Sequence, residues 1–124
     1  MRLLLDTHVL LWWLVGDALA PEVADQIADP EVSVAVSAAS VWEIAIKESL
    51  GKLRFKGSIA EQVRPNGFEP LSVSLDHAER AGALPAHHRD PFDRMLIAQA
   101  QVERLTIVTR DPAFDAYAVD VLHC

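Results

Sequence analysis

Near its start the sequence reads Leu3-Leu-Leu-Asp-Thr-His-Val-Leu-Leu-Trp-Trp-Leu14: a short apolar run, an aspartate and a longer apolar segment. Leu3–Leu5 has the length and apolar character of a buried strand, and Thr7–Val15 is long enough for a helix. Asp6 lies between them, where the strand ends. A strand that passes directly into a helix begins a β–α unit, so this stretch predicts an α/β fold.

The rest of the chain repeats the alternation of strand and helix. Four further runs have β-like patterns: Val32–Val36, Leu71–Leu75, Leu105–Thr109 and Ala118–Leu122. Five further segments have helical patterns: Pro21–Ala28, Ser37–Leu50, Ser58–Arg64, Leu75–Ala83 and Pro91–Glu103. Strands separated by helices favour a mainly parallel sheet flanked by helices. A length of 124 residues suits one such domain over residues 1–124.

The composition narrows the class of protein. The net charge is -7, which argues against non-specific capture of nucleic acid by the whole surface. The single cysteine, Cys124, excludes an internal disulfide and favours a reducing compartment, so we expect a cytoplasmic protein. No stretch approaches the ~18 apolar residues of a membrane helix, and we expect no membrane association.

Four acidic residues occupy positions that suit a shared site. Asp6 and Asp111 follow predicted strands, Glu43 lies in the helix after the second strand, and Asp93 lies in the first turn of the Pro91 helix. In an open parallel sheet, sites form beyond the carboxyl ends of the strands. Carboxylates gathered there repel one another, and a divalent cation removes that conflict. All-oxygen ligands suit Mg²⁺ or Mn²⁺ and point to chemistry on phosphate esters.

Asp6, Asp93 and Asp111 also have purely structural interpretations. Asp6 fits the N-cap of the first helix, and Asp111 fits a turn before Pro112. Asp90 reads as an N-cap followed by proline at the first helical position, which makes Asp93 a favourable first-turn acid. These alternatives leave the metal site as one of two hypotheses.

Glu43 has two structural alternatives of its own. The sequence Ser40-Val-Trp-Glu43 fits a capping box, although Ser37 is an equally good N-cap. Glu43 and Lys47 also form an i,i+4 pair of opposite charge on a helix. Taken alone, these patterns favour a structural role for Glu43.

Four segments, taken together and in order, resemble the PIN-domain ribonucleases, specifically the VapC-type toxins of toxin–antitoxin pairs. The matching stretches are Leu3–Leu14, Ser37–Lys47, Asp90–Ala100 and Val108–Asp111. The resemblance implies a five-stranded sheet in the order 3-2-1-4-5. It also implies that Asp6, Glu43, Asp93 and Asp111 bind Mg²⁺ or Mn²⁺ and act as the catalytic residues.

The resemblance further implies an activity and partners. A metal-bound water is expected to attack the scissile phosphate of an RNA and to leave a 5′-phosphate and a 3′-hydroxyl. A cognate antitoxin is expected to inhibit the enzyme by crossing the active-site groove, and the toxin is expected to form a homodimer. Trp12, Trp13 and Trp42 are candidates for contacts with the antitoxin, with burial in the core as the alternative.

Polar residues beside the four acids are candidates for binding substrate. Arg94 and Arg89 are predicted to hold a phosphate, and Thr7 is predicted to place a hydroxyl near the metal. His87 and His88 offer an acid–base alternative in which a 2′-hydroxyl attacks, or else lie in a solvated loop.

A basic stretch lies in the middle of the chain. It contains Lys47, Lys52, Arg54, Lys56 and Arg64. This stretch is interpreted as an RNA track, a contact for an acidic partner, or simply an exposed loop.

Two other functions compete with the ribonuclease. A receiver-like phosphoacceptor domain suits the length and the α/β pattern, but it needs an acidic pair after the first strand and a lysine after the last one. Here only Asp6 follows the first strand, and no lysine follows Lys56. A non-catalytic PIN-fold binding module is the second alternative, and the four intact acidic residues argue against it.

Overall fold

Five strands, all parallel, form the central sheet of the computed structural model, which describes residues 1–124. The strands are β1 (Arg2–Leu5), β2 (Ser33–Ser37), β3 (Glu69–Leu71), β4 (Thr106–Thr109) and β5 (Asp120–His123). Their order across the sheet is β3-β2-β1-β4-β5, as the resemblance implied. This order differs from the 2-1-3-4-5 order of receiver-type folds, so the receiver-like alternative is wrong.

Each of the predicted helical segments is a helix in the structure. The helices are α1 (Thr7–Val15), α2 (Pro21–Ala28), α3 (Ala38–Ser49), α4 (Ile59–Val63), α5 (Leu75–Ala83) and α6 (Pro91–Glu103). Two short 3-10 helices, Arg64–Asn66 and Pro112–Ala116, follow α4 and β4. None of the helices combines the length and apolarity that crossing a bilayer requires.

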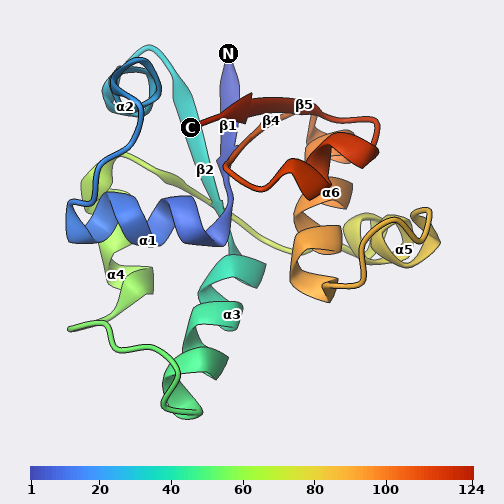
Figure 1. Cartoon of the computed structure of the whole chain (residues 1–124), viewed down its shortest axis with the longest axis horizontal. Helices are drawn as coiled ribbons and strands as arrows, with labels where there is room; N and C mark the ends of the chain where they lie inside the picture. The colour runs from blue at the N-terminus through green and yellow to red at the C-terminus, as the bar shows by residue number, and fades with distance from the viewer.

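The strands bury apolar side chains on both faces of the sheet. Successive side chains in a strand point to opposite faces, so Leu3 and Leu5 join one core and Leu4 joins the other. The first core also contains buried residues of α1, α2, α3 and α4, and the second contains residues of α6. Figure 1 accordingly shows α1, α2 and α4 on one side of the sheet and α5 and α6 on the other. The result is a three-layer α/β/α arrangement.

One predicted strand was misplaced. The alternation over Leu71–Leu75 predicted a strand there, but β3 covers Glu69–Leu71 and Leu75 begins α5. Val73 and Leu75 are exposed, so the period-two pattern does not reflect burial. Ser74 instead caps α5: its hydroxyl accepts from the His77 amide at 3.1 Å, and the Ser74 amide donates to His77 Nδ1 at 3.0 Å.

The carboxyl edge of the sheet is where the elements that matter for function meet. Because all five strands are parallel, β1, β2 and β4 end on the same side. Figure 1 shows α1 starting at that edge and α3 extending beyond it. The helix α6 begins close to α3, and the two are in contact. This arrangement places the ends of β1, β2 and β4 and parts of α1, α3 and α6 around one region.

Candidate active site

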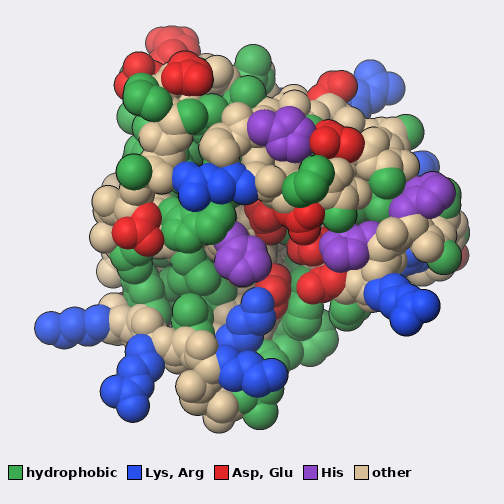
Figure 2. All heavy atoms as spheres, in the orientation of Figure 1, with side chains coloured by type: hydrophobic (Ala, Val, Ile, Leu, Met, Phe, Trp, Pro, Cys, Tyr) green, Lys and Arg blue, Asp and Glu red, His purple; other side chains and the backbone are tan.

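Acidic side chains gather in a hollow at the carboxyl edge of the sheet. Figure 2 shows them in the middle of this face, with histidines at the margins and basic side chains below. Asp6 and Asp111 follow strands, whereas Glu43 and Asp93 project from helices. Three of the acids lie close enough for their charges to interact: the charge of Asp6 raises the pKa of Asp93, and the charge of Glu43 raises the pKa of Asp6.

Asp6 is the most deeply buried of the four acids, with only 4% of its surface exposed. Its Oδ2 accepts a hydrogen bond from the Thr109 hydroxyl at 2.8 Å, whereas its Oδ1 is buried without a partner. Burial raises the pKa of Asp6, and the Thr109 hydrogen bond opposes that shift. Asp6 occupies the N-cap position of α1, as the structural alternative predicted, but its side chain makes no capping hydrogen bond, so capping does not account for the carboxylate. A buried carboxylate oxygen without a partner is unfavourable, and a bound cation is one group that satisfies it.

Glu43 is also buried, and both of its carboxylate oxygens have partners. Oε1 accepts from the Thr7 hydroxyl and Oε2 from Lys47 Nζ, each at 2.8 Å. The hydrogen bond to Glu43 raises the pKa of Lys47. Ser37 caps α3 through the Ala39 amide, so the capping box predicted at Ser40 is wrong and the Lys47 pair is present. The position of Glu43 is therefore fixed from two sides.

Asp93 lies in the first turn of α6 and faces both Asp6 and His88. His88 Nε2 is 2.7 Å from Asp93 Oδ2. Burial raises the pKa of Asp93 to about 7; the His88 hydrogen bond opposes this, while the charges of Asp6 and Asp90 add to it. Asp90 caps α6 by accepting from the Phe92 and Asp93 amides, as the sequence predicted. Asp93 thus bears more charge repulsion than a simple first-turn acid would.

Asp111 combines a structural role with a place at the site. Its Oδ1 accepts from the Ala113 amide at 2.9 Å and caps the short helix after β4, as predicted from the turn signal. Potential ligand atoms of Asp111, Asp93 and His88 also lie within 4.8 Å of one another. His88 was predicted only as an alternative acid–base residue. The sequence indicates this position only in that His88 stands five residues before Asp93.

Two of the supporting residues contact the acids or the loop beside them, and only Arg94 points away from the position predicted for it. Thr7 is buried and donates to Glu43, which favours a positioning role over contact with substrate. Arg94 turns away to the preceding loop and donates to the carbonyl oxygens of Ala81, Leu84, Pro85 and His88 at 2.9 to 3.3 Å. This geometry favours a structural role over a phosphate contact.

Arg89 differs from Arg94 in being exposed on the surface. Its role as a contact for a phosphate stays a prediction. Among the three tryptophans, Trp42 is 63% exposed, whereas Trp12 and Trp13 are half-buried. Trp12 lies under the Arg110 guanidinium, 4.1 Å from the ring centroid, and Trp13 Nε1 donates to Asn66 at 3.1 Å.

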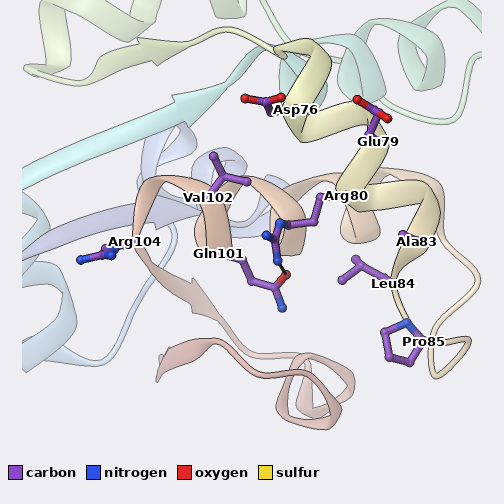
Figure 3. A pocket seen from close by; sticks show the side chains of 9 residues that line it. All are labelled: Asp76, Glu79, Arg80, Ala83, Leu84, Pro85, Gln101, Val102 and Arg104. Atoms are coloured by element: carbon purple, nitrogen blue, oxygen red, sulfur yellow. Dashed lines mark hydrogen bonds between the residues drawn. The ribbon is translucent and has the colours of Figure 1, made fainter.

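A broad hollow of about 940 Å³ lies elsewhere, between α5 and α6. Figure 3 shows exposed charged side chains around it, with Arg80 reaching Gln101 at a distance of 3.3 Å. Asp76 and Glu79 also line it, but both are exposed. The buried carboxylate with an unpaired oxygen, Asp6, lies at the carboxyl edge of the sheet and not in this hollow. The volume of a hollow therefore does not identify the candidate active site.

Comparison with known proteins identifies the family. A model of the PIN domain family matches residues 3–120. The chain is a PIN domain protein. Ribonuclease VapC22 of Mycobacterium tuberculosis is 33% identical to this PIN domain over 115 residues, covering 87% of this chain and 85% of the relative.

Solved structures share the fold of this PIN domain. The crystal structure of VapBC2 from Rickettsia felis, bound to a DNA fragment from their promoter, matches with a TM-score of 0.71 and 15% identity. That match covers 99% of this chain and 98% of the other. A toxin–antitoxin complex from Klebsiella pneumoniae matches with a TM-score of 0.65 and 22% identity, covering 96% and 94%. These likenesses support the fold of the PIN domain.

Proposed function

We propose that this PIN domain is a divalent-metal-dependent endoribonuclease of the VapC toxin type, which hydrolyses phosphodiester bonds in RNA. The observation that carries the proposal is the buried and unpaired Oδ1 of Asp6 beside Asp93 at the carboxyl edge of the sheet. The 33% identical relative named a ribonuclease supports the same activity. The ordered set of acidic residues favours an enzyme over a PIN-fold binding module.

The side chains at this edge fit a hard divalent cation. Asp6, Glu43, Asp93 and Asp111 supply carboxylate oxygens, which suit Mg²⁺ or Mn²⁺. A cation satisfies the unpaired oxygen of Asp6 and relieves the repulsion that raises the pKa of Asp93. When bound, such an ion lowers the pKa of a water and neutralises charge on a phosphate.

The chain's own residues hold the acids ready for that ion. Thr109 fixes one oxygen of Asp6, and Thr7 fixes one oxygen of Glu43. Lys47 offsets the negative charge of Glu43 at 2.8 Å. Preorganised side chains avoid the cost of rearrangement during the reaction. Arg89, exposed beside the site, is proposed to contact a phosphate of the RNA.

The proposal includes protein partners. Solved structures similar to this chain include toxin–antitoxin complexes, which supports a cognate antitoxin as the inhibitor. Trp42 is the best placed of the tryptophans to contact it, because its exposed ring packs edge-on against Phe92 of α6, with 5.2 Å between centroids. The proposal also includes a homodimer, which the VapC type implies, and a cytoplasmic location, which the single cysteine favours.

Cleavage of RNA by metal-stripped protein tests the proposal. Total RNA is incubated with the antitoxin-free protein, with and without Mn²⁺ or Mg²⁺. We expect discrete fragments with 5′-phosphate ends only when metal is present, and none from Asp93→Asn. Asp76→Asn is the matched control, because it removes an exposed carboxylate from the hollow between α5 and α6.

The alternatives have distinct outcomes in the same experiment. Metal binding without cleavage of any RNA supports a binding module. Cleavage that persists in Asp93→Asn and without metal overturns the metal mechanism and supports acid–base chemistry by His87 and His88.

A further inference from the structure

We propose that His88 is a nitrogen ligand of the metal centre through Nε2, and that the site therefore prefers Mn²⁺ to Mg²⁺. This inference rests on the proposed function, because it concerns the same centre. It changes the donor set from carboxylates alone to carboxylates and one imidazole, and so it specifies which ion the enzyme uses.

Geometry places the imidazole among the carboxylates. Ligand atoms of His88, Asp93 and Asp111 all lie within 4.8 Å of one another, a spacing that lets one ion contact all three. His88 Nε2 is 2.7 Å from Asp93 Oδ2, so the nitrogen points at the acid expected to hold the metal. The unpaired Oδ1 of Asp6, in a side chain that is 4% exposed, independently indicates a cation at this edge.

The backbone of His88 is held in place. Its amide donates to the Tyr117 hydroxyl at 2.8 Å, and its carbonyl accepts from Arg94 at 3.3 Å. The same hydroxyl donates to the Pro85 carbonyl at 2.8 Å, so Tyr117 holds Pro85 and His88 of this loop together. The imidazole packs edge-on against Phe114, with 6.4 Å between ring centroids. A ligand fixed in this way loses little freedom when an ion binds.

His87 provides the contrast. It lies next to His88 in the sequence but is exposed, and its ring packs edge-on against Tyr117 with 5.2 Å between centroids. The loop therefore presents one histidine to the acids and the other to solvent. A solvated loop, the structural interpretation of the pair, accounts for His87 but not for His88.

The donor set decides the preference between ions. Carboxylate oxygens suit Mg²⁺ and Mn²⁺ alike, whereas an imidazole is a better ligand for a transition metal than for Mg²⁺. Mg²⁺ also keeps several waters and demands near-octahedral geometry, which three or more fixed side chains restrict. One histidine among the carboxylates thus shifts the balance toward Mn²⁺.

Pulsed electron paramagnetic resonance of bound Mn²⁺ tests the ligand directly, without relying on activity. We expect a hyperfine coupling typical of a directly coordinated nitrogen, which changes when the wild-type protein carries nitrogen-15 histidine. His88→Gln removes the coupling and His87→Gln retains it. Thermal unfolding of both variants checks that they are folded, and the isotope experiment needs no variant.

A competition titration tests the preference. The concentration of Mg²⁺ that displaces Mn²⁺ is measured for the wild type, His88→Gln and His87→Gln. We expect His88→Gln to weaken Mn²⁺ binding by about 100-fold or more, because loss of a residue that only orients a ligand already costs about 10- to 100-fold, and to change Mg²⁺ binding far less. His87→Gln should match the wild type.

The outcomes separate this inference from the proposed function. Mn²⁺ that binds, is lost in Asp93→Asn and shows no nitrogen coupling overturns the role of His88 and leaves the metal nuclease intact. Equal weakening of Mn²⁺ and Mg²⁺ in His88→Gln likewise overturns the preference. Failure of the wild type to bind Mn²⁺ at all overturns both the ligand and the metal site.

Discussion

The hydroxyl of Thr7 donates to Glu43 Oε1 across 2.8 Å and joins residues 36 positions apart in the chain. Thr7 is the first residue of α1, directly after Asp6, and Glu43 lies in the middle of α3. Both side chains are buried. The bond therefore links α1 to α3. Because Thr7 directly follows Asp6, it also helps to fix the position of Glu43 relative to Asp6, and both acids are expected metal ligands.

Thr7→Val should weaken both the fold and the metal site. Valine keeps the shape but leaves a buried carboxylate oxygen without its donor, which costs about 1 to 3 kcal/mol of stability. Metal affinity should fall by about 10- to 100-fold, as for other residues that orient ligands. Thermal unfolding and Mn²⁺ titration measure the two effects. Thr106→Val, at a half-buried position in β4, is the control; equal metal affinity in both variants contradicts the positioning role.

The metal-free protein should lose stability as the pH rises from about 4 to about 7. Folded Asp93 has a pKa of about 7 against an ordinary 3.8, so the folded state binds more protons than the unfolded state in this window. Stability is therefore highest at the acidic end and lowest above pH 7. At about 1.4 kcal/mol per pKa unit, the difference is on the order of 2 to 4 kcal/mol. Chemical unfolding in EDTA at several pH values measures it.

Asp93→Asn and added metal provide the checks on this pH dependence. Asparagine carries no charge, so the variant should lose most of the slope, while Asp76→Asn should keep it. Saturating Mn²⁺ should also flatten the slope in the wild type, because the ion offsets the charge of Asp93. A slope that survives unchanged in Asp93→Asn assigns it to other groups.

The sequence predicted the positions of the acids well because simple geometry decides them. Residues that follow parallel strands must meet at one edge, and this rule placed Asp6 and Asp111 correctly. It could not decide which serine caps α3, since Ser37 and Ser40 both fit the local pattern. The structure decides it: Ser37 accepts from the Ala39 amide and caps α3, and Glu43 bonds Thr7 of α1 instead of the start of its own helix.

Other errors arose where local patterns were ambiguous. Alternating apolar and polar residues over Leu71–Leu75 predicted a strand, yet Leu75 is 86% exposed at the start of α5. Arg94 follows Asp93 and was expected to face substrate, but its guanidinium donates to one carbonyl oxygen at the end of α5 and to three in the loop before α6. Loop conformation of this kind has no periodic signal in a sequence, so the contacts of Arg94 could not be predicted, and for His88 the sequence offered only its closeness to Asp93.

Arg94→Lys should destabilise the loop that carries His88. Lysine cannot reproduce the planar fork that donates to several carbonyls at once, so the part-buried carbonyl oxygens of Ala81, Leu84 and His88 lose partners. We expect a loss of about 1 to 3 kcal/mol in stability and faster amide exchange over residues 84–90. A fall in RNA affinity with no loss of stability would restore the phosphate contact predicted from the sequence. Arg89→Lys is the control and should leave stability unchanged.

The exposed basic residues between α3 and α4 should bind RNA through its phosphates. Figure 2 shows basic side chains projecting below the acidic hollow, over the region where α3 and the segment after it lie. Lys52 and Arg54 are both exposed there. In an Asp93→Asn background, which prevents cleavage, Lys52→Gln with Arg54→Gln should weaken binding of a single-stranded RNA. The slope of log affinity against log salt should become shallower by up to about 1.4, at about 0.7 per phosphate contact.

A matched double variant separates a local track from a general effect of charge. Arg80→Gln with Arg104→Gln removes the same charge from the hollow between α5 and α6 (Figure 3), away from the acidic site. If the net charge of -7 alone governs RNA binding, both double variants should weaken it equally. If the basic residues after α3 form a track into the site, only Lys52→Gln with Arg54→Gln should change the salt slope. Filter binding at several salt concentrations distinguishes the two results.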